Sequence, residues 1–217
     1  MSSKKSIEVN VWSDIACPWC YVAKNIFKQS LNKFNQNYKD YTVNIIFHAY
    51  MIDPQTKIDG EDYLDYNKRR WGSDSWTKQL KSVGKKYGSN FDNWKIWPNT
   101  LLCHKLVAEA KKIGKGNEVL EEIFKYCYEL GKNVSDENIL NEIANKYGIN
   151  NWNTDENLKL VKNDEIIGKK NMELMLFLIL FFQMMRLLKE HQVLNHFYML
   201  LSKQLNNVLF IYKSYIF

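Results

Sequence analysis

The chain has 217 residues, of which 46% are hydrophobic and 25% are charged, and its formal net charge is +6. This length is sufficient for a buried core, and the composition is that of a globular protein rather than a disordered one. The basic residues are dispersed among acidic ones and form no stripe with interleaved aromatic residues, so we expect no nucleic-acid partner.

The first residues contain no export signal. Residues 1–6 lead directly into the first predicted strand, without an apolar segment or a small-residue cleavage site. We therefore expect a cytoplasmic protein, in which a permanent disulfide is unusual. We expect no membrane anchor either, because the apolar run 174–182 is shorter than the roughly 20 residues that cross a bilayer.

Two of the cysteines lie where a strand pattern changes into a helix pattern. Ile7, Val9 and Val11 alternate with polar residues, and after Cys20 the apolar residues recur at spacings of three and four. The first N–H groups of a helix lack internal partners and carry a partial positive charge, so they stabilise an anion. We therefore predict that Cys17, at or just before the helix start, is a thiolate, with Cys20 close enough to form a disulfide with it.

The segment Cys17-Pro18-Trp19-Cys20 is interpreted as a redox motif. Pro18 suits the first helical position, because the N–H that it lacks would have no partner there. A zinc site would need a second pair of ligands, and the other cysteines and the four histidines have no recognisable metal-ligand spacing. We predict Cys17 and Cys20 as the catalytic residues, Pro18 and Trp19 as supporting residues that set the redox poise, and neither a metal nor a bound cofactor.

The second predicted strand covers residues 41–49. Its apolar run is nearly continuous, which favours a strand that is buried on both faces. His48 lies in this strand and is interpreted as a core histidine with a hydrogen-bond partner.

Residues 55–160 are predicted to be mostly helical, without a convincing strand. Asn99 or Thr100 can cap one helix, and Ser135 can cap another. Cys103 and Cys127 lie on or beside the apolar sides of such helices, where a cysteine behaves as a small hydrophobic residue. We therefore interpret both as structural.

Four sequence blocks together resemble one family. They are VWSD at 11–14 with CPWCYV at 17–22, PNT at 98–100 with HKL at 104–106, GKNVSD at 131–136, and Asp164-Glu165. In this order they resemble the DsbA-like thioredoxin-fold oxidoreductases of the FrnE-type branch, over residues 7 to about 170. The resemblance implies an α/β, thioredoxin-like fold with a large helical insertion after the second strand. Its parts would be an N-terminal half (1–54), the inserted helical subdomain (55–160) and the return to the thioredoxin fold (161–217).

The resemblance also implies thiol–disulfide exchange, with a mixed disulfide at Cys17 that Cys20 resolves. The expected partners are protein or small-molecule thiols and disulfides, with glutathione as a candidate redox partner. The direction of exchange, the physiological substrate and the oligomeric state do not follow from the sequence.

Two other functions stay open. Glutathione-dependent transferases and isomerases of the kappa and 2-hydroxychromene-2-carboxylate isomerase type share this fold, but they typically carry a serine where Cys17 stands. A non-enzymatic, chaperone-like binder is the third reading. Its support is a group of aromatic residues that could line a groove for an unfolded chain, namely Trp71, Trp76, Trp94 and Trp97.

The chain departs from the family from about residue 171. Residues 171–217 contain no Gly, Pro, Ala, Thr or Asp, yet hold five of the seven methionines. Back-translated and read in another frame, the start of this segment gives KYGINVVP, which resembles the proline-containing segment that the family has here. We hypothesise an out-of-frame translation, with a divergent tail as the alternative, so the C-terminal strands would be missing or disrupted. Sequencing the transcript across codons 169–172 would decide between the two.

Overall fold

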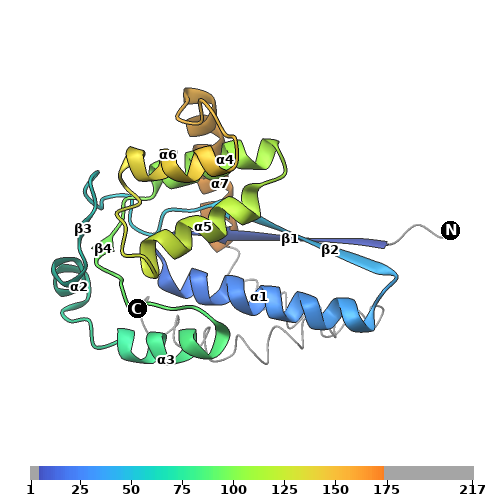
Figure 1. Cartoon of the computed structure of the whole chain (residues 1–217), viewed down its shortest axis with the longest axis horizontal. Coiled ribbons are helices and arrows are strands. Elements are labelled where there is room, and N and C mark those ends of the chain that lie inside the picture. The colour runs from blue at the N-terminus through green and yellow to red at the C-terminus, as the bar shows by residue number, and fades with distance from the viewer. Residues whose placement is uncertain (1–4, 174–217) are drawn as a thin grey trace.

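The computed structural model describes residues 5–173, in which a strand, a helix and a second strand precede a largely helical region (Figure 1). The strands are β1 (Lys5–Ser13), β2 (Tyr41–Ala49), β3 (Glu61–Asp62) and β4 (Ile96–Trp97). The helices are α1 (Pro18–Asn37), α2 (Tyr63–Trp71), α3 (Thr77–Tyr87), α4 (Leu101–Lys112), α5 (Gly116–Tyr128), α6 (Glu137–Lys146) and α7 (Asp155–Glu173). The hypothesis about the C-terminal strands concerns residues that, from 174 onward, lie outside this range.

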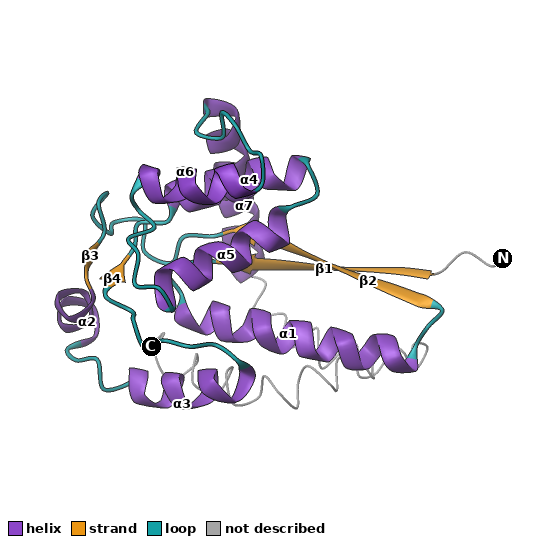
Figure 2. Ribbon diagram, viewed as in Figure 1, coloured by secondary structure: helices purple, strands orange, loops and turns teal. Residues whose placement is uncertain are grey.

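Strands β1 and β2 pair in parallel, from Lys5 opposite Tyr41 to Ser13 opposite Ala49. A parallel pair needs a crossover connection, which α1 supplies along one side of the two strands (Figure 2). Because both strands run in the same direction, Ser13 and Ala49 lie at the same end of the sheet. The predicted cysteine motif follows Ser13 and therefore also lies at this end.

Strand β2 has the predicted bounds, but within the described structure only one of its faces is buried. Val43, Ile45 and Phe47 are each 8% exposed, whereas Asn44 is exposed and His48 is half-buried. The prediction that both faces are buried is therefore wrong for this part of the chain. On its second face, Thr42 and Asn44 are exposed, and Ile46 and His48 are half-buried.

The helical region folds back onto the sheet through its last helix. Helix α4 packs against α5, α6 and α7, and α7 also packs against β2. The side chains at the centre of these contacts are fully buried, among them Leu106, Ile123 and Leu140. A helical segment thus follows the second strand, as expected. Helix α7 runs without a break across the boundary predicted at residue 160, so the exact limits of the subdomain stay a prediction.

Two details of residues 55–160 differ from the prediction. The short strands β3 and β4 pair in an antiparallel ladder, although two residues each are too few to produce a visible alternation. Helix α6 is capped by Asp136, whose carboxylate accepts a hydrogen bond from the Asn138 N–H, and not by Ser135. The Ser135 hydroxyl accepts the backbone N–H of Asn99 instead. Of the two residues predicted to cap α4, Thr100 occupies the cap position, but its side chain makes no capping hydrogen bond and its hydroxyl donates to Asp14 instead.

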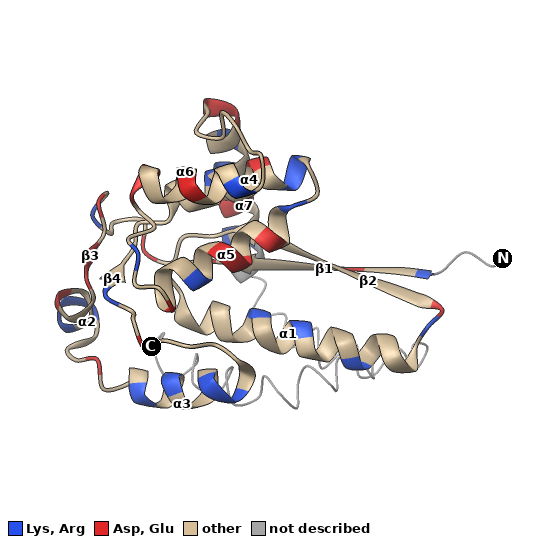
Figure 3. Cartoon of the chain, in the orientation of Figure 1, with Lys and Arg blue, Asp and Glu red and all other residues tan. Residues whose placement is uncertain are grey.

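Basic and acidic side chains are interspersed over most helices, whereas α1 and α3 carry basic residues without acidic ones (Figure 3). Within residues 5–173 we find no helix that combines the length and the apolar character needed to span a bilayer.

Candidate active site

The predicted motif forms the junction between β1 and α1. Cys17 is the residue before the first helical turn, with extended backbone angles (φ −86°, ψ 104°), and Pro18 occupies the first helical position. The Cys20 N–H donates to the Cys17 carbonyl oxygen at 2.9 Å, which closes the first turn. The predicted placement of both cysteines at the start of the helix is confirmed. Pro18 and Trp19 are both buried, so they pack the helix start into the core.

The two motif thiols are free and share a hydrogen bond, but their exposure differs. Cys17 is 2% exposed, whereas Cys20 is half-buried. The shared hydrogen bond and burial raise the pKa of Cys17 well above its ordinary value. The same hydrogen bond lowers the pKa of Cys20 against the effect of burial, helped by the Asp14 N–H and the Ser13 hydroxyl.

The pKa of Cys17 is thus raised and that of Cys20 lowered, whereas the sequence led us to expect the thiolate at Cys17. The helix terminus acts on both sulfurs, because they lie within one turn of it. The difference between the two thiols therefore comes from the local hydrogen-bond donors. These lie mainly around Cys20 and favour the thiolate form of that residue. A proton moving along the shared hydrogen bond exchanges the two forms.

A buried carboxylate, Asp14, lies directly before the motif. It is 2% exposed and accepts the backbone N–H groups of Ala16 at 3.1 Å and Ile52 at 2.7 Å. From helix α4 it receives the Thr100 hydroxyl at 2.6 Å and the His104 Nε2 at 3.3 Å. These four contacts fix the turn that carries the cysteines to the end of β2 and to the helical region.

The same turn is held from α5 as well. The Tyr128 hydroxyl donates to the Ile15 carbonyl oxygen at 2.7 Å, and its ring stacks with that of Tyr21 at 5.7 Å between centroids. Burial raises the pKa of Tyr128 well above its ordinary value, so this phenol remains a hydrogen-bond donor. The motif is thereby attached to α4 and α5 of the helical region.

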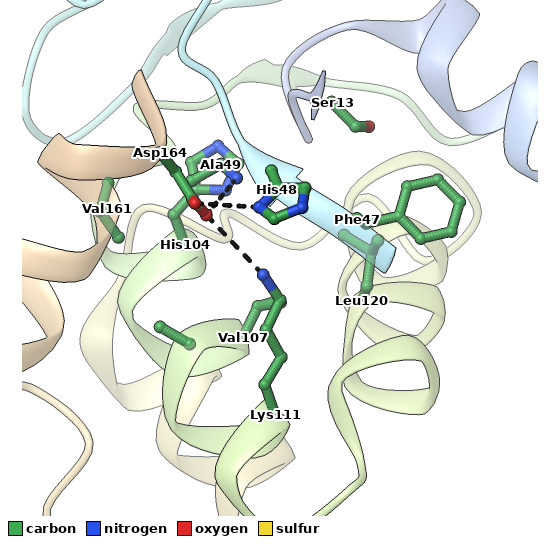
Figure 4. A pocket seen from close by; sticks show the side chains of 11 residues that line it. Ser13, Phe47, His48, Ala49, His104, Val107, Lys111, Leu120, Val161 and Asp164 are labelled. Carbon is green, nitrogen blue, oxygen red and sulfur yellow. Dashed lines mark hydrogen bonds and ion pairs between the residues drawn. The ribbon is translucent and has the colours of Figure 1, made fainter. Parts of the chain in front are cut away.

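A small cavity lies beside this network, on the side of β2 that faces α4 and α7. Its volume is about 10 Å³, and its polar lining groups are Ser13, His48, His104, Lys111 and Asp164 (Figure 4). The Asp164 carboxylate accepts from the His48 Nδ1 at 2.9 Å and from the Ala49 N–H at 3.1 Å, with the Lys111 ammonium 3.8 Å away. His48 thus has the hydrogen-bond partner that was predicted, although it is half-buried rather than part of the core.

The remaining cysteines behave as predicted for structural residues. Cys103 and Cys127 are 0% and 1% exposed, and the Cys103 thiol donates to the Val134 carbonyl oxygen at 3.1 Å. Burial raises the pKa of both thiols. Neither is therefore a nucleophile at neutral pH. Within residues 5–173 no cluster of three or more metal-ligating side chains is present.

The aromatic group proposed as a binding groove is for the most part core. Trp94 and Trp97 are 6% and 1% exposed, and Trp97 stacks on Tyr66 at 3.9 Å between ring centroids. Trp71, at 37% exposed, is the outermost of the four tryptophans. The observation that supported a chaperone-like binder is therefore explained by packing.

Asp14, Thr100 and His104 stand in family-like sequence blocks, but the sequence predicts no contact among them and no role for them in the site. Their contacts join positions 86 and 90 residues apart, and no periodicity reports such a pairing. One sequence feature does point to Asp14 as part of the site: it is an acidic residue that lies directly between the first strand and the cysteine motif.

A parallel strand pair joined by a helix, with a dithiol at the start of that helix, defines a thioredoxin-like domain. The model of the DSBA-like thioredoxin domain family matches residues 8–174. The chain belongs to this family.

The chain is also similar to three individual proteins. An uncharacterized protein of Bacillus subtilis (strain 168), YwbO, is 24% identical over 146 residues, which cover 66% of this chain and 68% of that protein. A crystal structure of a probable DsbA oxidoreductase from Streptomyces coelicolor has a TM-score of 0.62 at 22% identity and covers 77% of this chain and 75% of its own. A 2-hydroxychromene-2-carboxylate isomerase structure has a TM-score of 0.56 at 13% identity, with coverages of 76% and 81%. The two structures show that the fold is shared, and the family supports an enzyme with redox or isomerase activity.

Proposed function

We propose that the protein is a thiol–disulfide oxidoreductase that uses the Cys17–Cys20 pair. The observation that carries the proposal is the placement of two free thiols on the first turn of α1, where the Cys20 N–H donates to the Cys17 carbonyl oxygen at 2.9 Å. Such a pair holds one proton more weakly than the other, so it offers a thiolate, which is the nucleophile in disulfide exchange.

The reaction requires two displacements. A proton moves from Cys17 to Cys20 along the shared hydrogen bond, and the Cys17 thiolate attacks a substrate disulfide, releasing one substrate thiolate. The Cys20 sulfur then attacks Cys17 in the mixed disulfide, and the second substrate thiolate leaves. The protein pair is oxidised by two electrons and the substrate disulfide is reduced. In the reverse direction the same steps oxidise a substrate dithiol.

The first displacement requires that the substrate disulfide reach the Cys17 sulfur. Because Cys17 is 2% exposed, a substrate must uncover this sulfur before it reacts. The substrates we propose are protein or small-molecule disulfides and thiols, including glutathione, acting in the cytoplasm.

The motif variants test this proposal. Reduction of a disulfide reagent by the wild type, Cys17→Ser, Cys20→Ser and the control Cys127→Ala is followed over time. We expect Cys17→Ser to lose exchange, Cys20→Ser to accumulate a mixed disulfide visible by mass spectrometry, and Cys127→Ala to react like the wild type. Wild-type rates in both motif variants would refute the proposal.

A glutathione-dependent isomerase or transferase is the second candidate, favoured by the fold shared with the isomerase structure. That chemistry does not require a second sulfur in the motif. Glutathione conjugation or isomerisation that persists in Cys20→Ser would therefore favour it, whereas absence of both reactions together with a mixed disulfide on Cys17 would favour disulfide exchange.

A further inference from the structure

The outer side of helix α3 carries lysines and no acidic residue (Figure 3). Lys78, Lys81 and Lys85 recur at spacings of three and four residues, so they lie along one face of the helix. All three are exposed, and the exposed Lys86 lies beside them in the last turn. We call these four residues the lysine stripe. Another face of α3, which includes the fully buried Leu80, lies inward, and the helix packs against α1.

Neither helix stability nor a nearby acid within the described structure explains the lysine stripe. Lys81 and Lys85 repel each other at a spacing of four residues, and Lys78 lies near the positive end of the helix dipole. None of the four lysines forms an ion pair with another residue of 5–173. The Lys81 ammonium lies 5.9 Å from the centre of the Tyr63 ring, a contact that positions the charge without neutralising it.

The lysine stripe lies beside the half of α1 that carries the dithiol (Figure 1). The Asn25 side-chain amide donates to the Gly88 carbonyl oxygen at 3.3 Å and to the Ser89 hydroxyl at 2.7 Å, directly after the end of α3. Asn25 follows Cys20 by five residues of α1, which is about 7–8 Å along the helix axis. A partner bound to the stripe can therefore reach the motif with a short stretch of extended chain.

We propose that the lysine stripe docks an acidic segment of the protein whose disulfide or dithiol reacts with Cys17 and Cys20. This inference rests on the proposed disulfide exchange and adds the chemical class of its protein partner. Exposed lysines attract carboxylates over about 10 Å in 0.1 M salt, the Debye length there. Such an attraction acts mainly on the rate of encounter, so acidic partners should react faster than neutral ones.

Two other polyanions match the lysine stripe less well. A helix that lies on a membrane inserts apolar side chains, whereas the exposed residues between these lysines are Gln79 and Ser82. A nucleic acid presents a phosphate about every 1.7 Å along its axis and is bound by broad basic surfaces. Most other helices intersperse acidic side chains with basic ones, so the basic surface is largely that of α1 and α3 (Figure 3). A short acidic protein segment fits this extent.

The experiment compares two disulfide-bonded peptides that differ only in charge. One has glutamates beside its disulfide, and the other has glutamines at the same positions. The reduced full-length chain is mixed with each peptide, and reduction of the peptide disulfide is followed over time. We expect the glutamate peptide to react roughly 10-fold faster in low salt, the lower end of the range for electrostatic steering. The difference should disappear in about 1 M salt, where the Debye length is about 3 Å.

Variants of the lysine stripe test its part in this preference. Lys78→Gln, Lys81→Gln and Lys85→Gln together should remove the roughly 10-fold preference and leave the rate with the glutamine peptide unchanged. Changing the same three lysines to glutamate should make a peptide with lysines beside its disulfide the faster substrate. A merely structural role of these exposed side chains would not reverse the preference.

The matched control removes the same charge from another helix. Lys159→Gln, Lys162→Gln and Lys169→Gln change three exposed lysines of α7, and this variant should keep the wild-type preference. An equal loss of preference in the control would overturn the docking, because net charge rather than position would then be responsible.

The remaining outcomes separate the docking from the chemistry. Equal rates for the glutamate and glutamine peptides with the wild type would overturn the docking and leave the exchange intact. Binding of a DNA duplex or of anionic phospholipid vesicles through the lysine stripe, without a charge preference among peptides, would also overturn it. If the wild type reduces none of the peptides, the proposed function itself fails.

Discussion

Replacing Asp14 with asparagine should change stability and thiol acidity in opposite senses. The carboxylate accepts four hydrogen bonds, with the Ile52 N–H on one oxygen and Ala16, Thr100 and His104 on the other. An asparagine amide has one accepting oxygen, and its NH₂ group must face the donors on the other side. At least one buried donor therefore loses its partner.

The magnitude follows from that count. A buried donor without a partner costs about 1–3 kcal/mol. For a domain of this size, this corresponds to a fall of roughly 2–12 °C in Tm. The shared hydrogen bond and burial raise the pKa of Cys17, and the negative charge of Asp14 raises it further. The same charge also opposes the lowering of the Cys20 pKa. Its removal should therefore lower the pKa of the pair.

The assay combines thermal unfolding by circular dichroism with the pH dependence of thiolate absorbance, in Asp14→Asn and in the control Asp92→Asn. Asp92 is exposed, so the control should differ from the wild type by no more than about 0.5 kcal/mol. A less stable Asp14→Asn protein whose thiols titrate at the wild-type pH or above it would refute the electrostatic part of the reasoning. Unchanged stability would refute the hydrogen-bond part.

Three further outcomes are expected. Leu106→Ala removes a fully buried side chain and should cost about 2–5 kcal/mol in denaturant unfolding, whereas the half-exposed Ile113→Ala should cost less than about 0.5 kcal/mol. Burial raises the pKa of Glu121, but its lysine partners bring it from 4.5 to about 2. After solvent screening is allowed for, ionised Glu121 should stabilise the folded state by about 1 kcal/mol. This contribution should be present above pH 4.5 and lost as the pH falls towards 2, so Glu121→Gln should lack this part of the acid transition. A small alkylating agent should modify Cys20 before Cys17 in the reduced protein, as read by peptide mass spectrometry, because Cys17 is 2% exposed; the reverse order would contradict the described burial.

The local features of the motif could be predicted because short-range patterns determine them. The alternation in β1, the proline at the first turn of α1 and the placement of Cys17 depend on neighbouring residues only. Strand β2 was also predicted with its observed bounds, since its length and apolar content are strand-like. The degree of burial of its second face was not predictable, because it depends on which distant helix covers it.

Long-range contacts determine the features that the sequence did not reveal. Ser135 and Asp136 are both good helix caps, and the choice between them depends on Asn99, which binds the serine hydroxyl from 36 positions away. The relative acidity of Cys17 and Cys20 also depends on long-range contacts. The helix dipole acts on both sulfurs, and the donors that distinguish them are placed by the turn that Asp14 holds.

The attachment of the motif turn to α4 and α5 has a consequence for how this domain can change. Without the helical region, the turn that carries the cysteines would lose its hydrogen bonds to Thr100, His104 and Tyr128. Substitutions deep inside those helices will alter sulfur chemistry without touching a sulfur. Any movement that opens the helical region for a bulky partner will at the same moment loosen the loop that presents the cysteines.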